Sequence, residues 1–213
     1  NTNLSNQVIT FAADNIALSK HKAIFASLER IAGLQANVNV AAEVLMEQAK
    51  ELALQVDKDL LVQLKLASAA APDHIIASTV SIQADILEAR RLLHVAKVPA
   101  AGRYLVVSPD KEKTLLSTAD FVRADSYGSA AGLQNGELGR LYGSTVIMHT
   151  ELSGDEMLYF HPSHVGFAMQ LAPEYATNFD LPSVSDQYLL HQIYGMKTLD
   201  LGKRGVFINA TGT

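Results

Sequence analysis

Residues Asn39–Ser68 read NVAAEVLMEQAKELALQVDKDLLVQLKLAS, and this stretch decides the fold of the chain. No glycine or proline occurs between Gly33 and Pro72. Ala, Leu, Glu, Gln and Lys dominate, and these residues lose least on entering a helix. We predict a single helix over residues 39–68, roughly 40 Å long, which is longer than most helices of globular proteins. In a chain of 213 residues, such a helix is expected to be a spine against which other elements pack.

One face of this helix is apolar, because aliphatic residues recur at intervals of three, four or seven. The stripe consists of Val40, Val44, Leu45, Leu52, Val56, Leu60 and Leu64. Leu54, Leu61 and Leu66 lie off the stripe, so we expect the helix to be covered on more than one side. The charged run from Asp57 to Asp59 is expected to face solvent.

The composition describes a folded chain that can bury a real core, since 48% of its residues are hydrophobic and 18% are charged. Its length suits one large or two small domains. The net charge of −5 argues against a protein whose main task is to grip nucleic-acid backbone. It leaves open a container whose inner wall avoids sticking to DNA. The chain has no cysteine, which excludes disulfides, thiolate zinc sites and a cysteine nucleophile, and favours a reducing compartment.

No apolar run approaches the length that spans a bilayer, and no signal peptide opens the sequence. The first residue is Asn rather than Met. We therefore expect a chain that is processed or that begins inside a longer gene product.

The remaining elements are predicted from periodicity and from cap residues. Ser19 is expected to cap a helix whose apolar face contains Ile24, Phe25, Leu28 and Ile31. The stretch 165–171 can be helix or strand, and the polar stretch 173–185 is expected to be irregular. The chain should end in two or three strands, or in a helix plus strands. The other predictions are a strand at 8–11, a helix at 79–95, a strand at 103–107, a helix that Ser108 caps, and strands at 144–149 and 157–160.

No convincing site for chemistry emerges from the sequence. Five glycines lie in residues 126–143, but their spacing fits neither the dinucleotide fingerprint nor the phosphate-binding loop, so a contact loop is favoured. His161 and His164 form a weak metal pattern, because Pro162 lies between them and no further ligand converges. The serine in 127–132 lacks the spacing and the strand–turn–helix context of a nucleophile elbow. We therefore assign no catalytic residue, metal or cofactor.

The order of several short motifs resembles the tailed-bacteriophage major capsid proteins of the Hong Kong 97-like fold. The motifs are VPAAGRYLVVSP at 98–109, FVRADSYG at 121–128, NGELGRLYG at 135–143, FHPS at 160–163 and a later Tyr194-Gly195. Together they cover most of residues 37–208.

The resemblance implies an α+β fold with a long spine helix, a peripheral domain and an axial domain. It implies an extended-loop or arm remnant at 1–22, a peripheral domain at 23–74, an axial domain at 75–171 and a return to the peripheral domain at 172–213. Residues 8–11 would be the returning strand of a loop that reaches over a neighbouring subunit. The N-terminal arm and the outgoing half of that loop are absent from the sequence, so no cross-link is assigned.

The resemblance also implies a function, which is to form the icosahedral head shell of a tailed phage around double-stranded DNA. Partners would be copies of the chain in hexamers and pentamers, with scaffold, portal and decoration proteins, and DNA contacted without sequence specificity. No membrane partner is expected. The chain would be located in the virion after assembly in the host cytoplasm. The candidate subunit-contact residues are Arg123, Asp125, Gly136, Glu137, Gly139, Arg140 and Tyr142, in which Arg123 and Arg140 would pair with acidic residues such as Asp125 or Glu137.

Two other functions remain open at this point. A cellular nanocompartment shell of the same fold would enclose enzymes instead of DNA. A small-molecule enzyme would use His161, His164 and the 126–143 loop, and would be a small oligomer.

Overall fold

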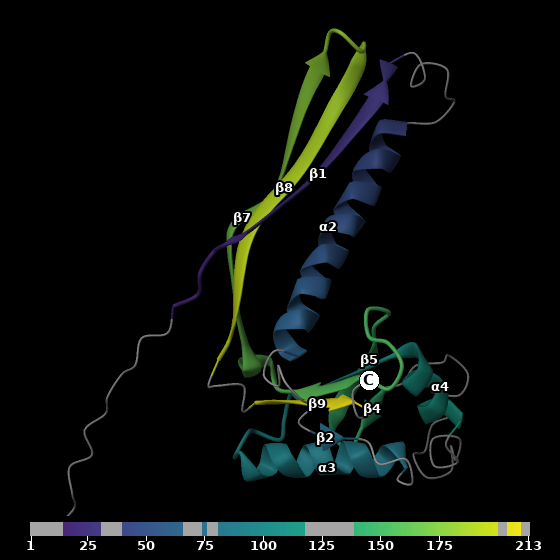
Figure 1. Ribbon diagram of the computed structural model, residues 1–213, viewed down its shortest axis with the longest axis vertical. Helices are drawn as coiled ribbons and strands as arrows, with labels where there is room; N and C mark the ends of the chain where they lie inside the picture. Colours follow the sequence, from purple (N-terminus) through teal and green to yellow (C-terminus); the bar gives the residue numbers. More distant parts are fainter. Residues whose placement is uncertain are drawn as a thin grey trace, which may run out of the picture.

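The computed structural model describes residues 15–30, 40–65, 74–75, 81–117, 139–199 and 204–209. Two sheets and one long helix organise these residues (Figure 1). The first sheet has three antiparallel strands in the order β1-β8-β7, with bounds Lys20–Glu29, Ser185–Thr198 and Val165–Asp180. The second sheet has six shorter strands. The fold is therefore mixed α and β, as the sequence predicted.

The long helix α2 spans Val40–Lys65, which confirms the predicted spine within the described residues. It runs along one face of the three-stranded sheet, over β8 and β1 (Figure 1). Leu52 on the helix and Leu190 on β8 are both buried at this contact. The C-terminal turns of α2 continue past this sheet and reach the second one. Leu61, one of the residues off the main stripe, is buried there.

The six-stranded sheet has the order β2-β9-β6-β3-β5-β4. The β3–β5 and β2–β9 pairs are parallel and the other pairs are antiparallel. Helix α3 (Ile82–Val95) lies within the helix predicted at 79–95 and begins after Ser81, a cap that was not predicted. Helix α4 (Pro109–Ser117) begins after Ser108, the cap that was predicted. The strand bounds are His74–Ile75 for β2, Tyr104–Val107 for β3, Arg140–Leu141 for β4, Ser144–Met148 for β5, Met157–Phe160 for β6 and Gly205–Asn209 for β9.

Alternation along β3 and β6 gives the six-stranded sheet two apolar faces. Leu105 and Tyr159 point into the main core, which α3 completes with Ile86, Ala89 and Leu93. Val106 and Leu158 point to the other face, where they meet Leu61, Leu64 and Leu152. The second cluster joins α2 to this sheet, so the spine packs against both sheets.

Residues 20–29 form strand β1, and the predicted helix at this position is wrong. Every residue of β1 pairs with β8, and exposure alternates from residue to residue. Ile24 and Leu28 are partly buried, whereas Phe25 is 59% exposed. Ile24, Ala26 and Leu28 fit a period of two, and Phe25 falls on the opposite face of the strand. Pairing with a distant strand decides between this period and the helical one.

The stretch expected to be irregular at 173–185 is also mostly strand. Strand β7 continues through residue 180, and a turn at 181–184 leads into β8. Its register shifts between Met169 and Leu171 and again between Leu171 and Glu174. The second interval contains Pro173, which has no N–H to donate. Polar residues such as Thr177 and Asn178 are compatible with this strand because it lies at the edge of the sheet, where both are exposed.

Two earlier predictions lie outside the described residues, namely the strand at 8–11 and most of the glycine-rich stretch 126–143. The expected domain boundary between residues 171 and 172 falls within β7. Strand β9, in the expected return to the peripheral domain, pairs with β6 and β2 in the six-stranded sheet. The chain ends, among the described residues, in the two strands β8 and β9.

Candidate subunit-contact site

Three of the candidate contact residues belong to the hairpin that β4 and β5 form. Gly139 lies just before β4, Arg140 is in β4 and Tyr142 is in the turn. Tyr142 and Gly143 form its two-residue turn, and their φ angles of 48° and 83° are both positive, as a type I′ turn requires. The Ser144 hydroxyl donates to the carbonyl of Leu141 at 2.6 Å, which closes the turn from inside. Gly139 has a φ of 56°, and its carbonyl accepts from the N–H of Val146 at 3.1 Å.

The hairpin holds Arg140 at the outer edge of the six-stranded sheet. Leu141 is buried and anchors the short strand β4, while Arg140 beside it is exposed. A short strand with a charged residue resists uncontrolled pairing through the sheet edge. The other candidates, Arg123, Asp125, Gly136 and Glu137, lie outside the described residues. Ion pairs of Arg140 with Asp125 or Glu137 therefore stay a prediction.

An exposed apolar surface, which the sequence did not reveal, runs along β7. Phe167, Met169, Tyr175 and Phe179 are about half exposed, and the β7–β8 register places them on the face that carries α2. Helix α2 covers β8 and β1 but leaves β7 open (Figure 1). The Tyr175 ring stacks on Tyr188 with an interplanar angle of 14°. The bulges of β7 interrupt the alternation of these residues, which hid the pattern in the sequence.

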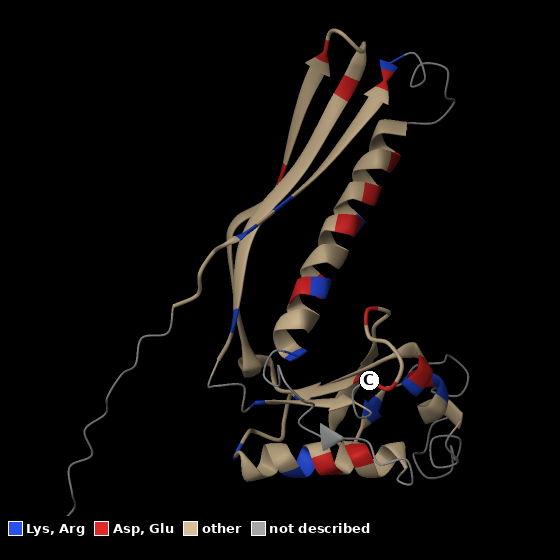
Figure 2. Cartoon of the chain, in the orientation of Figure 1, with Lys and Arg blue, Asp and Glu red and all other residues tan. Residues whose placement is uncertain are grey.

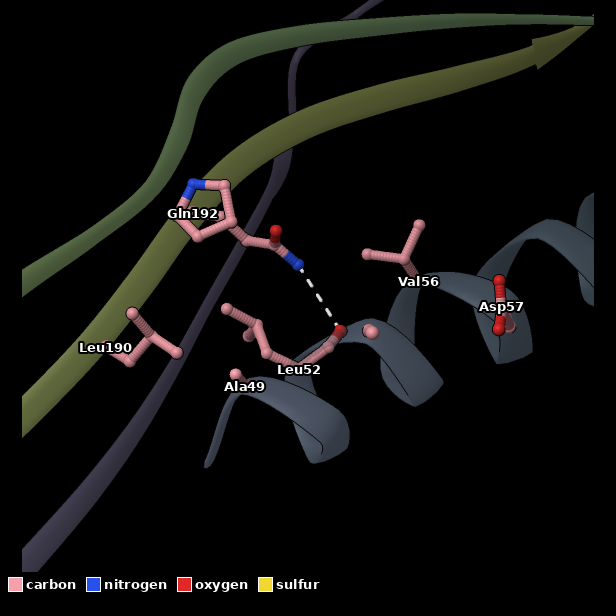
Figure 3. A pocket seen from close by; sticks show the side chains of 8 residues that line it. Ala49, Leu52, Val56, Asp57, Leu190 and Gln192 are labelled. Atoms are coloured by element: carbon pink, nitrogen blue, oxygen red, sulfur yellow. Dashed lines mark hydrogen bonds between the residues drawn. The ribbon is translucent and has the colours of Figure 1, made fainter. Parts of the chain in front are cut away.

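A groove lies between α2 and this side of the sheet. Its volume is about 360 Å³, and mostly apolar side chains line it. Figure 3 shows Leu190 and Gln192 on the strand opposite Ala49, Leu52 and Val56 on the helix. The Gln192 side-chain amide donates to the Leu52 carbonyl at 3.4 Å, so its polar group is used inside the fold. The groove therefore offers apolar contact area and little that could perform chemistry.

Ion pairs tie α2 to the loop between β5 and β6. The Lys65 ammonium donates to both carboxylate oxygens of Glu156, at 2.7 and 2.8 Å. The Lys58 ammonium lies 3.3 Å from a carboxylate oxygen of Glu151. Next to Lys58 on the helix, the Asp57 carboxylate lies 3.8 Å from the Nε2 of His149. Asp57 faces solvent as expected, since 55% of its side chain is exposed. Lys58 is 37% exposed and also pairs with Glu151 on this loop.

Asp59 is the centre of a polar cluster between α2 and the three-stranded sheet. Its carboxylate accepts from the Tyr194 hydroxyl at 2.7 Å, and the ammonium groups of Lys20 and Lys22 lie 3.2 and 3.6 Å away. Its side chain is 14% exposed, so the expectation that Asp59 faces solvent is wrong.

This cluster shifts the pKa values of both acids that meet in it. Burial alone would raise the pKa of Asp59, but the Tyr194 hydrogen bond and the two lysines outweigh it and hold the pKa below its usual range. Burial, together with the Asp59 carboxylate, raises the pKa of Tyr194 well above that of a free tyrosine. The carboxylate is therefore held ionised and the phenol neutral.

The histidine pair does not form an open site. The Nδ1 of His161 lies 2.7 Å from the Ser163 hydroxyl. His164 is fully buried, and Gly205 packs directly on its ring. Within the part of the chain that the structure describes, no three histidine or carboxylate side chains are grouped closely enough to hold a metal ion.

Charge on α2 is predominantly acidic along its exposed side (Figure 2). Glu43, Glu47 and Glu51 follow one another at intervals of four, and all three are exposed. This row repels the phosphate backbone of nucleic acid. Of the described helices, none combines the length and the apolar character needed to cross a bilayer.

Comparison with known proteins assigns this fold to a family. Residues 7–184 match the family model described as phage capsid protein. The chain belongs to the phage capsid protein family. A search of the curated proteins found no match.

Solved structures share the fold at low sequence identity. A chain of Mycobacterium phage Che8 is 24% identical, with a TM-score of 0.76 over 93% of this chain and 76% of that one. The capsid of cyanophage P-SCSP1u is 12% identical, with a TM-score of 0.77 over 100% and 81%. A virus-like particle from Pyrococcus furiosus is 9% identical, with a TM-score of 0.59 over 88% and 74%.

These similarities confirm the Hong Kong 97-like capsid fold. Together with the family match, they make this phage capsid protein a structural subunit that forms the shell of a virion. The exposed apolar surfaces described above are consistent with a subunit that is covered by its copies.

Proposed function

We propose that this capsid protein assembles as hexamers and pentamers into the icosahedral head of a tailed phage. The family match over residues 7–184 carries the proposal. The half-exposed aromatic residues of β7 support it, because a single chain leaves them uncovered. Closed symmetry multiplies modest contacts into a stable shell. Residues before β1 would belong to a loop that reaches over a neighbouring subunit.

The two sheets suggest how the subunit is divided into domains. We assign β1, α2, β7 and β8 to the peripheral domain, and the six-stranded sheet with α3 and α4 to the axial domain. This assignment moves the start of the returning segment from residue 172 to residue 165. It also places β9 in the axial domain, since β9 pairs with β6.

Arg140 is the described residue best placed for a contact between axial domains. It is exposed on a hairpin whose turn is closed from inside, so its loss should leave the fold intact. We expect Arg140→Ala to weaken capsomer formation while the melting temperature stays within about 1 °C of the parent. Lys50→Ala is the matched control, because Lys50 pairs with Glu47 on an exposed helix face. A normal yield of particles from Arg140→Ala would contradict this role.

The shell would enclose double-stranded DNA without gripping it in a sequence-specific way. The net charge of −5 and the acidic row on α2 support this, since a wall that bound phosphates tightly would hinder packing and release. Assembly would take place in the host cytoplasm, together with scaffold, portal and decoration proteins.

The similarity to the Pyrococcus furiosus particle supports a second candidate function, namely a nanocompartment shell that encloses enzymes. The two functions differ in their contents. Nuclease-protected DNA in purified particles would support the phage head, and co-purifying folded enzymes would support the nanocompartment.

Particle size is the experiment that decides between a shell and a small oligomer. The expressed chain is analysed by size-exclusion chromatography with light scattering and by negative-stain electron microscopy. Megadalton particles with icosahedral outlines are expected. A stable species near the 23.0 kDa mass of one chain, at every protein concentration and salt concentration tested, would refute self-assembly.

A further inference from the structure

Two glycines of the three-stranded sheet make room for the segment that precedes β1. A Cβ on Gly195 would overlap the backbone oxygen of Ala17. A Cβ on Gly166 would lie 2.8 Å from the Cδ1 of Ile16. Gly195 is on β8 and Gly166 is on β7. Residues 16–18, which come just before β1 in the chain, therefore cross both strands.

This crossing lies on the face of the sheet opposite α2. Side chains alternate along β8, and Tyr194 points toward α2, where its hydroxyl binds Asp59. Gly195 therefore faces the other side. Figure 1 shows the same path, with the chain before β1 passing across β8 and β7 and emerging beyond the edge of the sheet.

The first residues of β1 are held from the helix side as well. Lys20 stands opposite Tyr194 in the β1–β8 register, and Lys22 is two residues further on the same face. Both ammonium groups approach the Asp59 carboxylate. The consecutive residues Tyr194 and Gly195 thus act on opposite faces of one sheet.

We propose that Tyr194 and Gly195, with Asp59 and Gly166, form a two-sided clamp that fixes where the N-terminal part of the chain leaves the sheet, and that shell assembly requires this clamp. The partner is a second copy of the chain, which this segment would contact in the shell. The inference rests on the proposed function, because it names the residues that aim one subunit at the next.

The clamp explains why glycine is needed at two unremarkable strand positions. Glycine weakens a strand interior unless another backbone approaches closely. At Gly195 the approaching group is backbone, so no change of rotamer can relieve an added methyl group. At Gly166 it is the end of a side chain, so a smaller residue at position 16 can relieve it. The two positions therefore make different, testable predictions.

The test uses the full chain and two measurements, namely hydrogen exchange of the unassembled subunit and particle yield. We expect Gly195→Ala to speed exchange in peptides covering residues 15–22 by about tenfold or more, while α3 and β3 keep their protection. Particle yield should fall by about tenfold or more. Gly166→Ala should act in the same direction, and the double variant Gly166→Ala with Ile16→Ala should recover part of the yield.

Gly205→Ala is the matched control, because its Cβ would lie 2.8 Å from the His164 ring and would not meet residues 16–18. It should lower stability without selectively raising exchange at residues 15–22. Wild-type yield from Gly195→Ala, or a double variant no better than Gly166→Ala, would overturn the proposal. If the parent chain forms no particles at all, the proposed function fails, whereas the exchange data still decide whether the clamp holds residues 15–22.

Discussion

Leu64→Ala tests whether α2 is anchored to the six-stranded sheet as well as to the three-stranded one. Leu64 is 4% exposed and packs with Leu61, Val106, Leu152 and Leu158. The substitution removes three carbon groups, which are worth about 2.4 kcal/mol in transfer free energy. The cavity left behind adds to this loss, so we expect about 3–4 kcal/mol of lost stability.

Urea unfolding of the unassembled subunit, followed by circular dichroism, measures this loss. With a slope of about 2–3 kcal/mol per molar urea, the midpoint should fall by about 1–2 M. Val62→Ala on the same helix is the control, because Val62 is 55% exposed and alanine favours a helix. Its midpoint should hardly move. Equal losses from both variants, or a loss below about 1 kcal/mol for Leu64→Ala, would refute the packing of α2 against this sheet.

Three further substitutions probe the polar contacts and the hairpin. Asp59→Asn should remove a part of the stability that depends on pH. Because the folded pKa of Asp59 is lowered, the carboxylate contributes fully above about pH 4, and this contribution is lost as pH falls through the folded pKa. The melting temperatures of parent and variant should therefore differ near neutral pH and converge in acid. Lys65→Met should cost about 1–2 kcal/mol in urea unfolding by removing the pair with Glu156, and less in 1 M salt. Gly143→Ala should cost about 1–2 kcal/mol in the same assay, because its φ of 83° strains any residue with a Cβ.

The sequence predicted best the elements whose stability is local. Helix α2 has a long run of helix formers, and α4 has its Ser108 cap followed by Pro109, so both were found close to their observed ends. Strand β1 was misread because Ile24, Phe25 and Leu28 fit a helical period. The partner that makes it a strand, β8, lies about 160 positions later in the chain. Only tertiary pairing could resolve that choice.

The candidate contact site was only partly predictable for a related reason. The turn at Tyr142 and Gly143 depends on local sequence, and Gly139 and Gly143 mark this hairpin in the sequence. Asp59 carried no such signal, since its burial depends on Tyr194 and on Lys20 from two other elements. The need for glycine at position 195 is equally invisible, because Ala17 approaches it only in the folded chain.

The uneven burial of the two sheets gives a physical reason for assembly. The six-stranded sheet is packed on both faces, by α3 on one and by α2 on the other. The three-stranded sheet has α2 on one face only, and Phe25 on its other face is largely exposed, as is Leu181 at the tip of the β7–β8 turn. Exposed apolar surface of this extent costs free energy in water until another surface covers it. In a protein whose family forms shells, copies of the same chain are the natural cover, and variants that polarise Phe25 or Leu181 should therefore lower particle yield more than subunit stability.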